Sequence, residues 1–197
     1  EVVDFDGDGR DEILAASWEG ITLIDREPLG HWEALRIGTG DQESSPNKGC
    51  SEVKLGTLSD GRYYIATVEP WHGRQLVVYT PHGSGVYPVR VVVRLNWDRH
   101  VLANPLQWGH ALCCADLDGD GDHDLIVGQR DPNPPGAPGP RGPGVFVFEP
   151  QPGPREVNFE RHIIDDGGMA CEDLVAADLD HAGRLDLIAG GRATHNV

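Results

Sequence analysis

The stretch "DLDGDGDHDL" (residues 116–125) places five aspartates at every second position. Carboxylates this close repel one another, so a bound cation is the expected counter-charge. Gly119 and Gly121 lie between them and permit a tight turn. Ca²⁺ typically takes about six to eight oxygen ligands, and alternate side chains around a turn can supply them. The stretch therefore predicts a calcium loop, with the carbonyl of Asp122 as a further ligand.

The loop does not fit an EF-hand. An EF-hand loop carries a glutamate at its twelfth position and is followed by a helix. Counted from Asp116, the twelfth residue is Val127, and "DLIVGQ" is a short apolar run containing a glycine. Such a run favours a β-strand. The calcium loop is thus expected to lead into a strand.

Similar loops recur along the chain. "DFDGDGRDEI" (residues 4–13) repeats the pattern, whereas "DLDHAGRLDL" (residues 178–187) has Ala182 in place of the third ligand and is expected to bind weakly or not at all. A fourth copy, "GTLSDGRYYI" (residues 56–65), lacks the ligand set. The predicted metal ligands are Asp4, Asp6, Asp8 and Glu12 in one site, and Asp116, Asp118, Asp120 and Asp124 in another.

The repeats predict a β-propeller. Gly9, Gly61, Gly121 and Gly183 occupy the same place in the four loops and follow at intervals of 52, 60 and 62 residues. Each unit has short apolar runs before and after its loop, and repeats of this length made of strands are typical of propeller blades. We expect an all-β partial propeller of about 3.5 four-stranded antiparallel blades. The expected blades are residues 1–41, 42–103, 104–166 and an incomplete 167–197, with the remaining blades missing from this chain.

The composition limits which classes of partner and which cellular compartment are expected. The formal net charge of −16 argues against nucleic acid, which requires a basic surface. No apolar run reaches membrane length, so no membrane partner is expected. Loops of this kind bind Ca²⁺ at roughly 10⁻⁴–10⁻³ M, which suits an exported protein, periplasmic or extracellular. The four cysteines show no metal-binding spacing and are predicted to be buried free thiols.

A second candidate site lies at the end of the blades opposite the calcium loops. Turns into first strands and turns between second and third strands meet there, which brings together segments such as "EPWHGR", "QWGHAL" and "MACEDL". Trp71 and Trp108 accompany the polar residues and could stack on a sugar ring. His100 and His162 occupy one repeated position and are interpreted as structural. The predicted catalytic residues on this face are His72, His110, His195, Glu69, Glu172 and Arg130.

The sequence resembles known families at two levels. The aspartate loops resemble FG-GAP/VCBS repeats in all four units. More narrowly, "EPWHG", "WGHALCCADLDGDGDHDLIVG" and "GRATHNV" resemble the propeller of the aldos-2-ulose dehydratase (1,5-anhydro-D-fructose dehydratase) family and its bacterial relatives. That resemblance implies a seven-bladed ring, the elimination of water from keto-sugars, and a use of divalent cations. The family's fungal enzyme adds cupin domains, of which this chain shows no segment.

The residues leave the chemistry open. Dehydration of a keto-sugar needs a base, an acid for the leaving hydroxyl, and a group that holds the enolate, roles that histidine and arginine can fill. Three histidines on one face could equally hold Zn²⁺ with an open position. The calcium loops could hold Mg²⁺ instead. A non-catalytic propeller that binds carbohydrate or protein, and a purely structural array, are the competing hypotheses.

Overall fold

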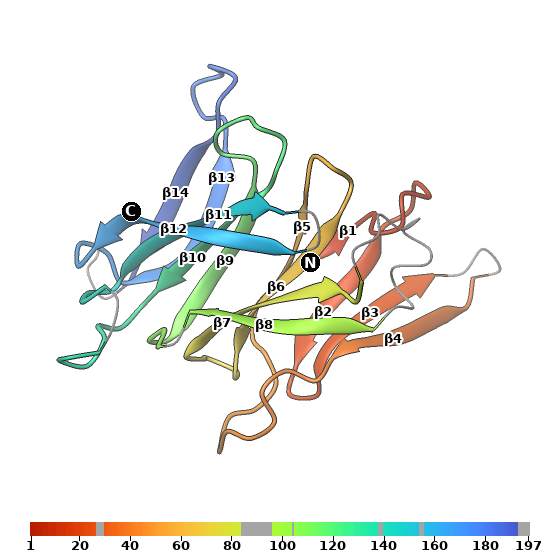
Figure 1. Cartoon of the computed structure of the whole chain (residues 1–197), viewed down its shortest axis with the longest axis horizontal. Helices are drawn as coiled ribbons and strands as arrows, with labels where there is room; N and C mark the ends of the chain where they lie inside the picture. Colours follow the sequence, from red (N-terminus) through yellow and green to blue (C-terminus); the bar gives the residue numbers. More distant parts are fainter. Residues whose placement is uncertain (27–29, 84–95, 104, 138–139, 154–155, 193–197) are drawn as a thin grey trace.

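The chain folds into four antiparallel sheets that lie side by side in chain order (Figure 1). The computed structural model describes residues 1–26, 30–83, 96–103, 105–137, 140–153 and 156–192. Within these ranges all regular structure is β-strand. None of the described residues belongs to a helix long and apolar enough to cross a membrane.

Each sheet is a meander, so strands that are consecutive in the sequence pair as neighbours. The first sheet contains β1 (Val2–Val3), β2 (Glu12–Ser17), β3 (Gly20–Arg26) and β4 (Trp32–Gly38). The second contains β5 (Val53–Thr57), β6 (Tyr63–Glu69), β7 (Gln75–Pro81) and β8 (Trp97–Ala103). The third contains β9 (Gly109–Ala115), β10 (Asp124–Gln129), β11 (Gly144–Pro152) and β12 (Val157–Asp166). The fourth described sheet pairs β13 (Cys171–Ala177) with β14 (Asp186–Gly191).

Burial follows the position of a strand within its sheet. All six residues of β10 are buried, because neighbouring sheets cover both of its faces. In the outer strand β12, most side chains are exposed and the others are half-buried. Continuous apolar runs thus mark the middle of a blade, and mixed sequences mark its outer edge.

The hydrophobic core lies between the sheets. One cluster joins Leu14 and Leu23 of the first sheet to Ile65 and Tyr79 of the second. A second cluster joins the second and third sheets, and a third joins the third sheet to β13. Face-to-face packing of successive four-stranded sheets is the architecture of propeller blades. The predicted fold class, an all-β partial propeller, is therefore confirmed.

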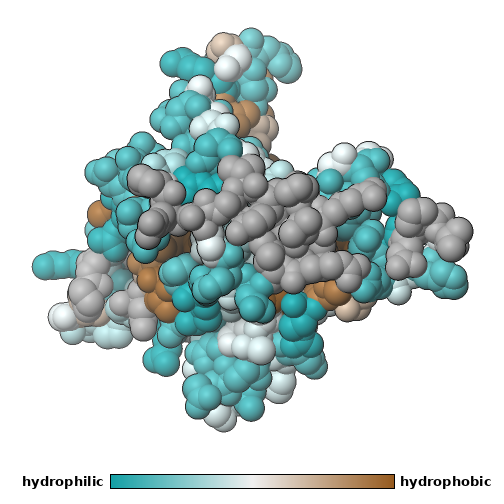
Figure 2. Space-filling model, turned by 45° about the vertical axis from the view of Figure 1, so that its right-hand side comes forward, coloured by the Kyte–Doolittle hydropathy of each residue, from teal (hydrophilic) through white to brown (hydrophobic). Residues whose placement is uncertain are grey.

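Several local expectations have clear outcomes. The cysteines form no disulfide, but only Cys50 and Cys171 are fully buried, whereas Cys113 and Cys114 are partly buried. The latter two point to opposite sides of β9 and pack in different core clusters. The proline- and glycine-rich stretch of residues 130–144 connects β10 to β11 within one sheet. On the face seen in Figure 2, most of the coloured side chains are hydrophilic.

Candidate functional site

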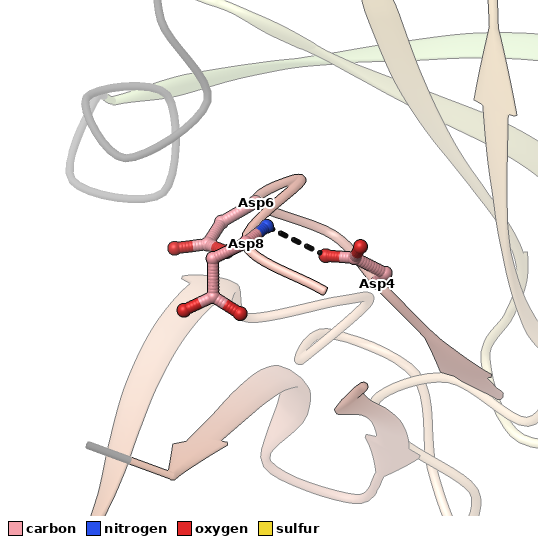
Figure 3. Close-up of side chains that lie close together, drawn as sticks. All are labelled: Asp4, Asp6 and Asp8. Atoms are coloured by element: carbon pink, nitrogen blue, oxygen red, sulfur yellow. Dashed lines mark hydrogen bonds between the residues drawn. The ribbon is translucent and has the colours of Figure 1, made fainter. Parts of the chain in front are cut away.

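The aspartate loops connect the first and second strands of their sheets. In the loop between β1 and β2, ligand oxygens of Asp4, Asp6 and Asp8 lie within 4.8 Å of one another. Figure 3 shows these three carboxylates around the turn, with the Asp8 backbone N–H donating to Asp4 Oδ1 over 3.1 Å. Asp116, Asp118 and Asp120 form the same arrangement between β9 and β10. Three oxygens at this separation can share one cation.

The predicted fourth ligands are used differently in the structure. Glu12 Oε2 accepts hydrogen bonds from the backbone N–H groups of Phe5 at 2.8 Å and Asp6 at 3.2 Å. Asp124 Oδ2 accepts one from Leu117 N–H at 3.1 Å. Both carboxyls are buried at the base of their loops, and burial raises the pKa of Glu12 and raises that of Asp124 to about 6. They brace the loop backbone, as Asp186 does in the third loop by accepting from Leu179 N–H at 3.1 Å, and their predicted role as fourth cation ligands stays a prediction.

The third loop also gathers its carboxylates. Asp178, Asp180 and Asp186 offer oxygens within 4.8 Å of one another, although Ala182 replaces an aspartate. The sequence analysis expected this loop to bind a cation weakly or not at all. The structure gathers three carboxylates here as well, but the third is Asp186, the counterpart of Glu12 and Asp124, and the strength of binding stays a prediction.

At the opposite end of the blades, two predicted histidines meet across a blade interface. His72 lies in the turn between β6 and β7, and His110 is the second residue of β9. His72 Nδ1 lies 2.7 Å from His110 Nε2, a hydrogen-bonding distance. The second and third sheets therefore supply one imidazole each to a single pair.

Acidic and basic groups of the fourth sheet extend this pair. Glu172 in β13 places Oε2 3.5 Å from His110 Nδ1, and its Oε1 lies 3.5 Å from Nε of Arg192. His110 and Glu172 are each only one-fifth exposed, whereas the Arg192 side chain is 77% exposed. The structure therefore brings three predicted residues, Glu172, His110 and His72, into one line that crosses three sheets.

Aromatic side chains and an arginine enclose the pair. The rings of Trp71 and Trp108 lie edge-on to His72, with centroid distances of 4.2 and 5.7 Å. Arg130 stacks over Trp108 at 4.7 Å and forms an ion pair with Asp131. Burial lowers the pKa of His72, and the nearby charges of His110 and Arg130 lower it further, against a smaller opposing effect of Glu172.

Glu69 is placed elsewhere. Its side chain is fully buried, where it accepts hydrogen bonds from the Tyr79 hydroxyl at 2.8 Å and from Nε of Arg99 at 2.9 Å. Burial raises its pKa, which these two donors oppose. This carboxylate anchors β6 to β7 and β8, so we assign it a structural role instead of the predicted catalytic one. His195, also predicted for the site, lies outside the described residues.

Sequence reasoning missed two features of this site. It did not single out Arg192 as the partner of Glu172. It also gave no sign that His72 and Trp108 adopt left-handed backbone conformations, with φ of 54° and 52°. Non-glycine residues rarely adopt such angles, and they concentrate at functional sites.

The arrangement can perform proton transfer. Two hydrogen-bonded imidazoles, one backed by a carboxylate, can take up and return protons near neutral pH. A tetrahedral zinc bound at about 2.0–2.1 Å would instead hold its ligand nitrogens roughly 3.3 Å apart. The observed 2.7 Å separation thus fits a direct hydrogen bond better than a shared metal.

Fold and site together define a class: a propeller of four-stranded blades with aspartate loops at one end and a histidine site at the other. Residues 2–82 match the family model described as the β-propeller domain of aldos-2-ulose dehydratase. The aldos-2-ulose dehydratase of Phanerodontia chrysosporium is 32% identical over 142 residues, which cover 66% of this chain and 15% of that protein. The chain therefore resembles the propeller domain of aldos-2-ulose dehydratase, as the sequence motifs predicted, although it spans only a small part of that relative.

Proposed function

We propose that this chain forms part of a propeller that dehydrates a keto-sugar, with the paired histidines as its acid–base centre. The observation that carries the proposal is the 2.7 Å contact between His72 Nδ1 and His110 Nε2 beside Glu172. The similarity of the chain to an aldos-2-ulose dehydratase supports the reaction class. The substrate class would be a 2-keto-sugar such as 1,5-anhydrofructose.

The residues divide the work as follows. A ketone acidifies the neighbouring C–H, whose proton passes to the histidine pair while the electron pair forms an enolate. Arg130, a permanent cation beside the pair, can hold the enolate oxygen. The enolate then expels the hydroxyl group one carbon further along, and the same pair returns the proton, so that water leaves. Trp71 and Trp108 offer ring faces on which a sugar can stack.

The calcium loops serve the fold in this proposal. Asp4, Asp6 and Asp8, and their counterparts Asp116, Asp118 and Asp120, offer the hard oxygen donors that Ca²⁺ prefers, and Mg²⁺ is the alternative ion. They lie at the end of the blades opposite the histidines and so would not touch the substrate. Weak calcium affinity of this kind suits a protein exported to the periplasm or the cell exterior. The loops themselves are proposed to be FG-GAP/VCBS repeats.

The test is incubation of the full-length protein with 1,5-anhydrofructose, following the ultraviolet absorbance of the unsaturated product. His110→Ala should reduce kcat by about 10²–10⁴-fold, the usual contribution of a general acid or base. His162→Ala is the matched control, because His162 lies on the outer strand β12, where it pairs with Glu149 of β11 away from the site. Equal loss in both variants would indicate damage to the fold.

Turnover at the wild-type rate in His110→Ala would contradict the catalytic role and would favour a propeller that binds carbohydrate without catalysis. Stoichiometric zinc in active protein would favour a metal site over the acid–base pair.

A further inference from the structure

The turn that carries Trp71 and His72 stands on a single pair of strand ends. β6 ends at Glu69 and β7 begins at Gln75, and these two residues pair across the base of the turn. Residues 70–74 project beyond them. The contacts that fix the two strand ends relative to each other therefore also determine where the rings of Trp71 and His72 lie.

A guanidinium from the outer strand joins these two ends. Arg99 of β8 donates from Nε and Nη2 to Glu69 Oε2, at 2.9 and 2.6 Å, and Nη2 also donates to Gln75 Oε1 at 2.7 Å. The other carboxylate oxygen of the fully buried Glu69 accepts from the Tyr79 hydroxyl at 2.8 Å. A planar guanidinium holds its donors in a rigid fork, so it sets both acceptors at once. We call this contact of Arg99 with Glu69 and Gln75 the Arg99 bridge.

The other blades show that the fold does not require a charged residue at this place. The last residue of the second strand is Ser17 in β2 and Gln129 in β10, where β6 has Glu69. Both neutral side chains brace their own turns, since Ser17 Oγ donates to Gly20 C=O at 3.2 Å and Gln129 Nε2 donates to Asp131 C=O at 2.8 Å. A buried ion pair usually adds little net stability over a neutral arrangement. We therefore relate the charged contact to the turn that carries His72.

The repeat also contains a comparable arginine that is not used in this way. Arg161 of β12 corresponds to Arg99 of β8, because each lies two residues after the aromatic residue of its strand, Trp97 or Phe159. Arg161 is exposed, whereas the Arg99 side chain is only one-third exposed. The arginine is thus shared by two blades, and its burial against a turn is a feature of the blade with His72.

The tip of the turn packs directly on the residue that Arg99 binds. A Cβ at Gly73 would lie 2.1 Å from the carbonyl carbon of Glu69, and Gly73 C=O accepts from Gly109 N–H of the next blade at 3.1 Å. His72 has a φ of 54°, which a residue other than glycine keeps only where surrounding contacts impose it. A displacement of Glu69 would therefore be passed on to His72.

We propose that Arg99 is a positioning residue, which holds Glu69 and Gln75 together and thereby keeps Trp71 and His72 in the geometry that the substrate meets. The effect on catalysis rests on the proposed function, whereas the positioning itself concerns only where the two rings lie. Arg99 acts through the backbone of the turn and takes no part in proton transfer.

The test compares two variants of the full-length protein. Gln75→Met keeps the approximate shape of the side chain and the ion pair of Glu69 with Arg99, but it removes one acceptor of the Arg99 bridge. Arg99→Met removes the whole bridge. The NMR signals of the His72 ring report its position, because the Trp71 ring lies edge-on to it at 4.2 Å. Both variants should shift these signals, and Arg99→Met should shift them further.

Turnover of 1,5-anhydrofructose provides the second measurement. The turn carries both a proposed acid–base group and a proposed stacking ring, so kcat and KM should change together. Arg99→Met should lower kcat by about ten- to hundredfold and raise KM, since a misplacement of about 1 Å can cost about 10²-fold. A loss of folded protein alone would instead lower the apparent kcat and leave KM unchanged.

Arg161→Met is the matched control and should leave the His72 signals, kcat and KM at their wild-type values. His72 signals that stay in place in Gln75→Met and in folded Arg99→Met would overturn the positioning role. If Arg99→Met does not fold, unmoved signals in Gln75→Met alone would overturn it, as would equal shifts in Arg161→Met. Shifted His72 signals in a protein whose wild type dehydrates no keto-sugar would refute the proposed function and support the positioning role.

Discussion

At the scale of single residues, one position of the repeated loop has two uses. The residue after the glycine that all four loops share is Arg10, Arg62 or Arg184 in three copies and Asp122 in the other. Arg10 and Arg62 turn back to the aspartate two positions earlier in their own loops. Asp122 instead accepts hydrogen bonds from the N–H and hydroxyl of Ser59, both at 2.7 Å, in the preceding sheet. A change of one side chain converts a local contact into a link between blades.

This difference gives a first prediction. Asp122→Ala should destabilise the fold by about 1–3 kcal/mol, because it leaves a part-buried N–H of Ser59 without its partner. Arg10→Ala at the equivalent position removes only a partly exposed ion pair and should cost less than about 1 kcal/mol. Urea unfolding of both variants in excess calcium measures the two costs. Equal losses would show that the link between the blades contributes nothing of its own.

The pH dependence of the reaction follows from His72. Its pKa lies below the usual 6.5, chiefly because of burial. The neutral base therefore predominates at pH 7, and kcat/KM should fall only as the pH drops through a midpoint below 6.5. The same lowered pKa means that any stability gained from this group is present above pH 6.5 and is lost as the pH falls.

Arg130→Met tests the cause of that shift, because the arginine charge helps to lower the pKa of His72. The acid midpoint of kcat/KM should move upward in this variant. Arg161→Met on the outer strand β12 should leave the midpoint where it is. A midpoint above 6.5 in the wild-type protein would contradict the assignment of His72.

At the scale of strands, glycines set how closely neighbouring blades approach. A Cβ at Gly38 of β4 would lie 2.5 Å from the ring of Tyr79 in β7 of the next sheet. Gly128 of β10 similarly faces Cys171 of β13, where a Cβ would lie 2.4 Å from Sγ. Tyr79 in turn donates its hydroxyl to Glu69, so the close approach at Gly38 also positions the buried carboxylate.

Gly38→Ala should therefore lower the free energy of unfolding by about 1–3 kcal/mol, the usual cost of overpacking a core. Gly190→Ala in β14 is a matched control, since its Cβ would meet its nearest atom at 3.9 Å. Chemical denaturation of both variants provides the comparison. Similar stability of the two would mean that the Tyr79 ring can move aside without cost.

Sequence patterns predicted the elements better than the contacts among them. Strands and loops could be located because apolar runs and glycines recur in every repeat, and the meander then fixed which turns share an end. That topology was sufficient to place His72 near His110. It could not predict the use of Glu69, because the Arg99 that binds it comes from a strand two removed, and side-chain pairing depends on register. The contact of Arg192 with Glu172 likewise depends on side-chain positions that the repeat pattern does not give.

At the scale of the whole molecule, the chain carries a net charge of −16, and the aspartate loops gather part of its carboxylates at one end of the blades. Self-repulsion of this kind weakens a compact state, and bound cations relieve it. The loop between β9 and β10 also contacts the second sheet, where Tyr64 donates to His123 C=O at 2.6 Å and His123 N–H donates to Thr57 C=O at 2.8 Å. Cation binding there should stiffen a contact between blades as well as the loop itself.

Removal of calcium should therefore lower the stability of the whole propeller. With a dissociation constant of about 10⁻³–10⁻⁴ M, 10 mM Ca²⁺ contributes about 1.4–2.7 kcal/mol per site. Melting temperatures with calcium and with EDTA, on protein shown to bind the ion, measure the sum. Asp6→Asn and Asp118→Asn should each remove part of the stabilisation by calcium, whereas Asp60→Asn in the loop without ligands should not.

Asp180→Asn decides whether the third loop takes part: a lower calcium stoichiometry than wild type would show that Asp178, Asp180 and Asp186 bind calcium despite Ala182. A melting temperature that EDTA leaves unchanged would refute the calcium proposal for every loop.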